Sequence, residues 1–239
     1  MTTVLITGAN RGFGLALAEQ FALRGDGPVI ACCRNPAKAD ALRALADRFP
    51  QIEVMALDVS DHAAIEALGQ QLGQRPIDLL INNAGIFGKN PPATTGFADQ
   101  VFGNSDFPED WIKPFTINVM GPMKLIETLV DNVAASQQKK VVIITSIVGS
   151  IASAMGQMFG YAASKAAANM TARNLSVALR DRNIIVNPLH PGYAKTDMGG
   201  DAAHVEVADA VAGIMGQIDQ MSLDASGQFL SFDGATLPW

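Results

Sequence analysis

The sequence is poor in cysteine and has no long apolar run. Its two cysteines, Cys32 and Cys33, are neighbours and are badly placed to bridge each other or to bind a metal. Reduced thiols in a cytoplasmic protein are the simplest interpretation. No apolar run approaches the roughly 18 residues needed to span a bilayer. The start, Met1–Thr3, lacks the basic and long apolar regions of a signal peptide, so we expect neither membrane insertion nor export.

Charged residues are also scarce. Lysine, arginine, aspartate and glutamate make up 17% of the 239 residues, and the formal net charge is -6. No cluster of basic residues is dense enough to indicate a nucleic-acid surface. The histidines His62, His190 and His204 are scattered through the chain and do not form a metal-binding set. We therefore expect neither a nucleic-acid partner nor a metal site.

Hydrophobic residues make up 49% of the chain, which suits one well-buried domain over residues 1–239, although the length alone permits two. Short apolar runs alternate with helical stretches. Strands are predicted at Val4–Thr7, Val29–Cys32, Glu53–Leu57, Asp78–Ile81, Val141–Ile144, Ile184–Val186 and Gln228–Leu230, and helices at Gly14–Leu23, Pro36–Arg48 and Asp61–Leu72. Continuously apolar strands are typical of a sheet covered on both faces. The alternation predicts an α/β fold, with a doubly wound parallel sheet of about seven strands and helices on both faces.

A glycine-rich turn follows the first predicted strand. Gly8, Gly12 and Gly14 have the spacing Gly-x-x-x-Gly-x-Gly, between a strand and a helix. Glycines in this context permit a tight turn and a close approach of the backbone to a pyrophosphate. The alternative is a glycine-rich turn that binds nothing.

A tyrosine and a lysine lie one helical turn apart at Tyr161 and Lys165. Residues four apart share one face of a helix. A nearby ammonium favours the phenolate, so we expect the pKa of the tyrosine to fall from about 10 toward neutrality. Such a tyrosine can act as an acid and a base at pH 7.

These motifs occur along nearly the whole chain in the order of the short-chain dehydrogenase/reductase family, which the sequence resembles. The matching residues are Thr7, Gly8, Gly12 and Gly14; Asp58 and Val59; Asn82-Asn83-Ala84-Gly85; Asn118; Ser146 with Gly149; Tyr161 and Lys165; and Pro191-Gly192 with Thr196. The stretches His190–Gly200 and Asp233–Trp239 look most like the C-factor-like carbonyl reductases. The resemblance implies a single-domain Rossmann fold and an oxidoreductase that uses a dinucleotide.

The residue that follows the second strand indicates which dinucleotide is used. NAD sites usually place a carboxylate there, whereas this chain reads Cys32-Cys33-Arg34. A guanidinium suits the 2′-phosphate of NADP(H), and Arg11 is a second candidate for that contact. We therefore expect NADP(H) rather than NAD(H), with a solvated Arg34 as the alternative. The complete predicted cofactor site is Gly8, Asn10, Arg11, Gly12, Phe13, Gly14, Arg34, Asp58, Val59, Asn83, Ala84, Gly85, Tyr161, Lys165, Pro191, Gly192, Ala194 and Thr196.

The predicted catalytic set is Asn118, Ser146, Tyr161 and Lys165. Reduction of a carbonyl needs a hydride, a proton donor and a group that polarises the oxygen. Tyr161 would donate the proton in reduction and accept it in oxidation, and Ser146 would bond the substrate oxygen. The resemblance adds that Lys165 bonds the nicotinamide ribose and that Asn118 anchors a water leading to Lys165. Taken singly, Ser146 could instead satisfy backbone groups, Asn118 could be a polar residue between helices, and Tyr161 a core residue.

The substrate is predicted from three loops, residues 86–110, 147–160 and 192–205. The first is long and rich in Gly, Pro, Asn and Thr, as functional loops often are. Apolar candidates in or near these loops are Phe87, Phe97, Phe102, Ile147, Ile151, Met155 and Phe159, with Lys89 as a lone charge. We expect a small, uncharged or weakly polar aldehyde, ketone or secondary alcohol.

Two other classes of protein remain as alternatives. One is a regulatory or signalling protein that uses the same fold as a dinucleotide sensor. The other is a longer-chain sugar-nucleotide epimerase or dehydratase, but the glycine spacing and the short stretch after Gly200 argue against it. By analogy with the family, we expect a homodimer or homotetramer through helices near Asn118–Val133 and Tyr161–Leu179. The second helix carries the small residues Ala162, Ala163, Ala166, Ala167 and Ala168, which permit close packing.

Overall fold

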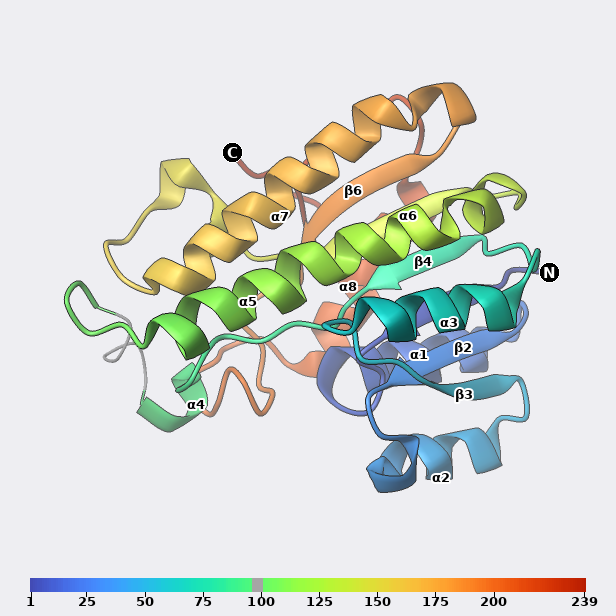
Figure 1. Ribbon diagram of the computed structural model, residues 1–239, viewed down its shortest axis with the longest axis horizontal. Coiled ribbons are helices and arrows are strands. Elements are labelled where there is room, and N and C mark those ends of the chain that lie inside the picture. The colour runs from blue at the N-terminus through green and yellow to red at the C-terminus, as the bar shows by residue number, and fades with distance from the viewer. Residues whose placement is uncertain (96–100) are drawn as a thin grey trace.

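The computed structural model describes residues 1–95 and 101–239 of the chain. A parallel sheet of seven strands forms the centre of this part of the chain (Figure 1). The strands are β1 (Val4–Thr7), β2 (Val29–Cys33), β3 (Ile52–Ala56), β4 (Leu79–Asn82), β5 (Lys140–Ile144), β6 (Ile185–His190) and β7 (Leu230–Ser231). They lie in the order β3-β2-β1-β4-β5-β6-β7. The predicted α/β fold with about seven parallel strands is confirmed.

Helices cover both faces of the sheet. Helices α1 (Gly12–Arg24), α2 (Asp40–Arg48) and α8 (Val207–Gln220) pack on one face, and α3 (His62–Leu72), α6 (Gly121–Ala134) and α7 (Phe159–Ala178) pack on the other (Figure 1). Successive strand residues point to opposite faces, so Val4 and Ile6 join the first core and Leu5 joins the second. Both faces of the strands are therefore buried, which explains their continuously apolar sequences.

The described residues between 86 and 117 are more helical than predicted. The predicted loop Ile86–Asp110 contains the short helix α4 (Pro92–Thr95) and the start of a π-helical segment, Phe107–Ile112. That segment continues through α5 (Lys113–Phe115) and a second π-helical turn, Thr116–Met120, into α6. The richness of Ile86–Asp110 in Gly, Pro, Asn and Thr suggested a loop, but here Asp106 caps the helix and Pro108 lies in its first turn.

Several other elements differ from prediction at their ends, among them β6, which was predicted at Ile184–Val186 and continues to His190. The predicted helix over Pro36–Arg48 consists of a 3-10 turn, Pro36–Lys38, followed by α2. The last strand is Leu230–Ser231 rather than Gln228–Leu230, because the residues that pair with Leu189 and His190 of β6 are Leu230 and Ser231. Among the described residues, no helix is both long enough and apolar enough to cross a membrane.

The sheet brings the predicted motifs to one edge. All neighbouring strands are parallel, so their carboxyl ends lie along the same edge. The glycine-rich turn follows β1, Asn83 follows β4, Ser146 follows β5 and Pro191 follows β6. Ligands of open α/β sheets bind at this edge, where the strand order reverses. In this chain the reversal lies between β1 and β4.

Candidate active site

The glycine-rich turn is packed directly against the end of β4. Asn83 Nδ2 donates a hydrogen bond to the main-chain oxygen of Thr7 at 2.9 Å. Gly8 and Gly12 have φ values of +66° and +53°, which favour glycine. A Cβ added to Gly14 would lie 2.3 Å from the main-chain oxygen of Gly8 and 2.5 Å from Asn83 Nδ2. The turn therefore needs glycine at these positions.

Two cavities adjoin at this edge of the sheet. The smaller has a volume of about 330 Å³ and the larger about 720 Å³. The two cavities share the lining residues Phe13, Asn83, Gly85, Ile86, Thr196 and Met198. Volumes of this size hold small molecules and parts of cofactors. One extended ligand can thus occupy both cavities.

The smaller cavity gathers most of the predicted cofactor site. It is lined by the predicted residues Gly8, Asn10, Arg11, Gly12, Phe13, Arg34, Asp58, Val59, Asn83, Ala84, Gly85 and Thr196. Of the remaining predicted residues, Tyr161, Lys165, Pro191, Gly192 and Ala194 line the larger cavity. Gly14, in α1, lines neither cavity, because it packs behind Gly8. The cradle of glycines and the adjoining polar groups fit a dinucleotide.

Three basic side chains surround the smaller cavity. Arg34 and Lys38 line it together with Arg11. Arg11 Nη1 lies 2.8 Å from Asp197 Oδ2, and both side chains are largely exposed. Asp58 Oδ1 accepts hydrogen bonds from the main-chain nitrogen and the hydroxyl of Ser60. Sequence reasoning missed Lys38, although a second basic residue four positions after Arg34 was a usable signal.

The larger cavity contains Ser146, Tyr161 and Lys165. Helix α7 places Tyr161 and Lys165 one turn apart, and the side chain of Ser146 is hydrogen-bonded to that of Tyr161. Lys165 Nζ donates to the main-chain oxygen of Ile144 at 3.0 Å and lies 5.7 Å from the centroid of the Tyr161 ring. A hydroxyl pair and a buried amine therefore meet at one end of a cavity that reaches the glycine-rich turn.

The prediction of a lowered tyrosine pKa is wrong for this structure. Burial raises the pKa of Tyr161 to about 12, and only the hydrogen bond with Ser146 opposes this rise. Burial also lowers the pKa of Lys165 to about 8. Loss of hydration disfavours the charged form of each group. Tyr161 is therefore a protonated phenol at neutral pH.

Asn118 lies behind the cavities rather than in them. Its side chain is 2% exposed, in the π-helical turn that precedes α6. Its Oδ1 accepts from the main-chain nitrogen of Ile86, and its Nδ2 donates to the main-chain oxygen of Ile86 and to Ser164 Oγ. A Cβ on Gly85 would lie 3.2 Å from Asn118 Oδ1 and 3.5 Å from Lys165 Nζ. Asn118 thus holds the segment after β4 close to Lys165.

The walls of the larger cavity are mostly apolar. All three predicted loops contribute, through Ile86, Phe87, Pro92, Ile147, Val148, Met155, Met158, Tyr193, Met198 and Val205 among others. The ring of Phe87 lies 4.7 Å from that of Tyr161. Among the described residues, Phe102, Ile151 and Phe159 do not line the cavity, and Phe97 lies outside the described residues. Sequence reasoning missed His190, Ser231, Phe232, Asp233, Ala235 and Leu237, which also line it.

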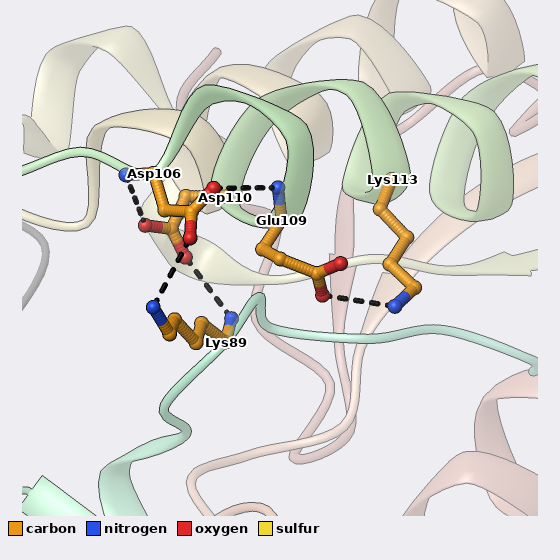
Figure 2. Close-up of polar contacts among 5 residues, drawn as sticks. All are labelled: Lys89, Asp106, Glu109, Asp110 and Lys113. Atoms are coloured by element: carbon orange, nitrogen blue, oxygen red, sulfur yellow. Dashed lines mark hydrogen bonds and ion pairs between the residues drawn. The ribbon is translucent and has the colours of Figure 1, made fainter.

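Lys89 is paired rather than a lone charge. Its Nζ lies 3.1 Å from Asp106 Oδ2, and its main-chain nitrogen donates to Oδ1 of the buried Asp110 at 3.0 Å (Figure 2). Asp110 Oδ2 also accepts from the main-chain nitrogen of Asp106 at 2.9 Å. This cluster joins the two ends of the segment between residues 89 and 106. Within the described part of the chain, no group of acidic, cysteine or histidine side chains is suited to a metal.

Comparisons with known proteins agree with this geometry. A family model described as short chain dehydrogenase matches residues 2–206. The C-signal of Myxococcus xanthus is 34% identical over 165 residues, which cover 69% of this chain and 93% of that protein. The 1-hydroxy-2-glutathionyl-2-methyl-3-butene dehydrogenase of Rhodococcus sp. strain AD45 is 30% identical over the full length of both. The structure of NADPH-bound carbonyl reductase from chicken fatty liver superposes with a TM-score of 0.89 at 32% identity, covering 100% of this chain and 99% of that one.

The buried lysine predicts a pH-dependent cost to stability. The pKa of Lys165 falls from 10.5 to about 8 on folding. The unfolded chain therefore binds more protons between these values, so the contribution of Lys165 to the free energy of unfolding is lowest below pH 8 and rises toward pH 10.5. Lys165→Met should be more stable than the wild type at pH 7, by about 3 kcal/mol at most. This advantage should shrink by pH 10.

Urea unfolding of cofactor-free protein at pH 7, 8.5 and 10 measures this difference. Lys113→Met, at a lysine with a side-chain exposure of 51%, is the control and should show no such trend. A difference between Lys165→Met and the wild type that stays constant with pH would contradict the assignment.

Proposed function

The chain belongs to the short-chain dehydrogenase family, and from this premise we propose that it is an NADP(H)-dependent oxidoreductase. It transfers a hydride between the nicotinamide and the carbonyl or secondary alcohol carbon of a small, largely apolar substrate. The observation that carries the proposal is the hydrogen-bonded pair Ser146 and Tyr161 beside Lys165, in a cavity continuous with the glycine-rich turn. The likeness to a carbonyl reductase from chicken fatty liver supports it.

The chain's own residues supply the proton chemistry. Tyr161 stays protonated at neutral pH and donates its proton to the substrate oxygen in reduction. Ser146 holds that oxygen next to the phenol and stabilises the charge that develops on it. Lys165, whose pKa burial lowers to about 8, exchanges protons near neutral pH and restores the proton of Tyr161. Asn118 positions the segment beside Lys165. The bound nicotinamide supplies the hydride.

The smaller cavity holds the adenosine half of the cofactor in this proposal. Gly8, Gly12 and Gly14 bring the backbone close to the pyrophosphate. Arg34 and Lys38 bind the 2′-phosphate, because no carboxylate follows β2 to bond a free ribose hydroxyl. The chicken relative was solved with NADPH, which supports NADP(H) for this chain.

Substitution of Tyr161 tests the proton donor. Tyr161→Phe removes the hydroxyl and keeps the ring, so kcat for carbonyl reduction should fall about 1000-fold while the Kd for NADPH stays unchanged. The measurement is NADPH oxidation with a panel of neutral aldehydes and ketones, and fluorescence titration for binding. Tyr193→Phe is the matched control, because Tyr193 lines the same cavity and donates to the main-chain oxygen of Gly199. Turnover retained by Tyr161→Phe would overturn the assignment.

Substitution of Arg34 tests the choice of dinucleotide. Loss of a charge-assisted contact to phosphate should raise the Kd for NADPH by about 10-fold or more in Arg34→Ala, and leave the Kd for NADH unchanged. Arg43→Ala is the control, because Arg43 pairs with Asp40 on α2 and lies outside the cavity. Wild-type protein that binds NADH as tightly as NADPH, or an equal loss for both cofactors, would rule out this role.

A second candidate function is a regulatory or signalling role with little turnover. The identity of 34% with the C-signal of Myxococcus xanthus favours it. The filled catalytic positions Asn118, Ser146, Tyr161 and Lys165 favour the enzyme instead. Tight NADPH binding without turnover across the carbonyl panel would support the regulatory role.

We also propose that the chain forms a dimer or tetramer through the helical residues Asn118–Val133 and through α7. These elements expose Met120, Met170 and Val177 to between 50% and 65%. Ala162, Ala163, Ala166 and Ala167 of α7 are partly exposed and permit close packing, whereas Ala168 belongs to the core.

Light scattering at micromolar concentration should give the mass of a dimer or tetramer. Met170→Lys should shift that mass toward the monomer, because a charge in an apolar interface is costly. Leu23→Lys is the control, because Leu23 is an exposed apolar residue on α1, on the other face of the sheet from α7, and this change should leave the mass unchanged. A monomeric wild type would contradict the proposal.

A further inference from the structure

The last eleven residues form a hairpin, which we name the C-terminal hairpin (Phe229–Trp239). Residues Leu230 and Thr236 form an antiparallel bridge. The main-chain nitrogen of Leu237 donates to the main-chain oxygen of Phe229 at 2.8 Å, and that of Ser231 donates to the oxygen of Ala235 at the same distance. Gly234 has a φ of +95° and turns the chain between them. The hairpin is thus a defined element rather than a loose tail.

One side of the hairpin is a wall of the larger cavity. The wall is made by Ser231, Phe232, Asp233, Ala235 and Leu237. Leu237 is the only aliphatic side chain longer than alanine in this set. Asp233 and Lys165 are the only formally charged side chains among the described lining residues. The hydroxyl of Ser231 and the main-chain nitrogen of Ala235 donate to Asp233 and hold its pKa below the usual value, so it stays ionised at neutral pH.

The hairpin is fastened to both loops that carry the proposed site. At its end, the Trp239 ring stacks on Phe229 at 5.6 Å, and the main-chain nitrogen of Ala152 donates to the main-chain oxygen of Trp239 at 3.0 Å. Ala152 follows Ser146 by six residues. At its start, Phe232 packs so closely on Gly192 that an added Cβ would lie 2.9 Å from the Phe232 ring. The wall therefore keeps a set distance from Ser146 and from the loop after β6.

We propose that the C-terminal hairpin determines which substrates the cavity accepts. Leu237 limits the size of the apolar group beside the carbonyl, Asp233 disfavours an anionic group there, and Trp239 holds the wall in position. The inference rests on the proposed carbonyl reductase activity. The substrates expected for that activity are neutral ketones and aldehydes with an apolar substituent that packs against Leu237. Asp233 and Leu237 act as specificity-determining residues.

The experiment compares kcat/KM for two neutral aryl ketones that differ only by a bulky alkyl substituent. Leu237→Ala should shift the ratio toward the bulky ketone by about 10-fold, since one or two methylenes in an apolar pocket change selectivity by this amount. Trp239→Ala should shift the ratio in the same direction, and Trp239→Phe, which keeps a stacking ring, should shift it less. Leu23→Ala, at an exposed leucine on α1, is the matched control and should leave the ratio unchanged.

A second pair of substrates, a keto acid and its methyl ester, tests the charge. Asp233→Asn keeps an oxygen that accepts from Ala235 but removes the negative charge. It should raise kcat/KM for the keto acid by several-fold and leave that of the ester unchanged, because the carboxylates of Asp233 and of the keto acid carry like charges, which repel each other. Equal effects on acid and ester would overturn the role of Asp233.

Failure of the hairpin proposal can be separated from failure of the proposed activity. If the wild type reduces neither ketone, the proposed carbonyl reductase activity is wrong. Calorimetry then measures the binding constants of the same ketones for the NADPH complex, and these constants test the role of the C-terminal hairpin without turnover. An unchanged ratio of rates, or of binding constants, in Leu237→Ala with a wild-type melting temperature would overturn the hairpin proposal. If Leu237→Ala lowers the melting temperature, Leu237→Val keeps the fold and should show a smaller shift in the same direction; no shift there would also overturn it.

Discussion

The close approach of β1 and β4 is the contact on which the rest of the site depends. Thr7 Oγ1 accepts hydrogen bonds from the main-chain nitrogens of Asn83 and Ala84, both at 3.0 Å. Asn83 Nδ2 reaches back to the main-chain oxygen of Thr7. Gly14 then packs so tightly behind Gly8 that no side chain fits between the turn and Asn83. Because these ends are joined, the hollow above the glycine-rich turn and the cavity around Tyr161 become continuous.

Burial, more than ion pairing, sets the electrostatics of the larger cavity. It raises the pKa of Tyr161 to about 12 and lowers those of Lys165 and His190 to about 8 and about 4. Each group is pushed toward its neutral form, as expected where water is replaced by apolar side chains. A neutral phenol beside a hydroxyl is suited to the proton donation that the proposed carbonyl reduction needs. The apolar walls that cause these shifts also favour a neutral substrate.

Segments that are distant in the sequence complete the walls. Asp110 and Asp106 join the two ends of the segment that follows β4, so Lys89 is paired instead of facing a substrate (Figure 2). The C-terminal hairpin reaches Ala152 through Trp239 and lies beside Gly192 through Phe232. In the proposed enzyme, specificity depends on contacts between loops and the C-terminal hairpin, whereas the proton chemistry depends on α7 and the end of β5.

The sequence by itself determined the order of strands and helices along the chain, the glycine-rich turn at Gly8 and the shared helix face of Tyr161 and Lys165. These follow from local rules: apolar runs, glycine spacing and the helical repeat are properties of neighbouring residues. Ser146 was identified through the resemblance to the family. Only the tertiary structure decided the pKa of Tyr161, the pairing of Lys89 and the part played by Leu237. Burial and long-range contacts depend on what lies across the fold from a residue, and no local pattern records that. The helical start at Phe107 was missed for a related reason, because proline is common both in loops and in the first turn of a helix.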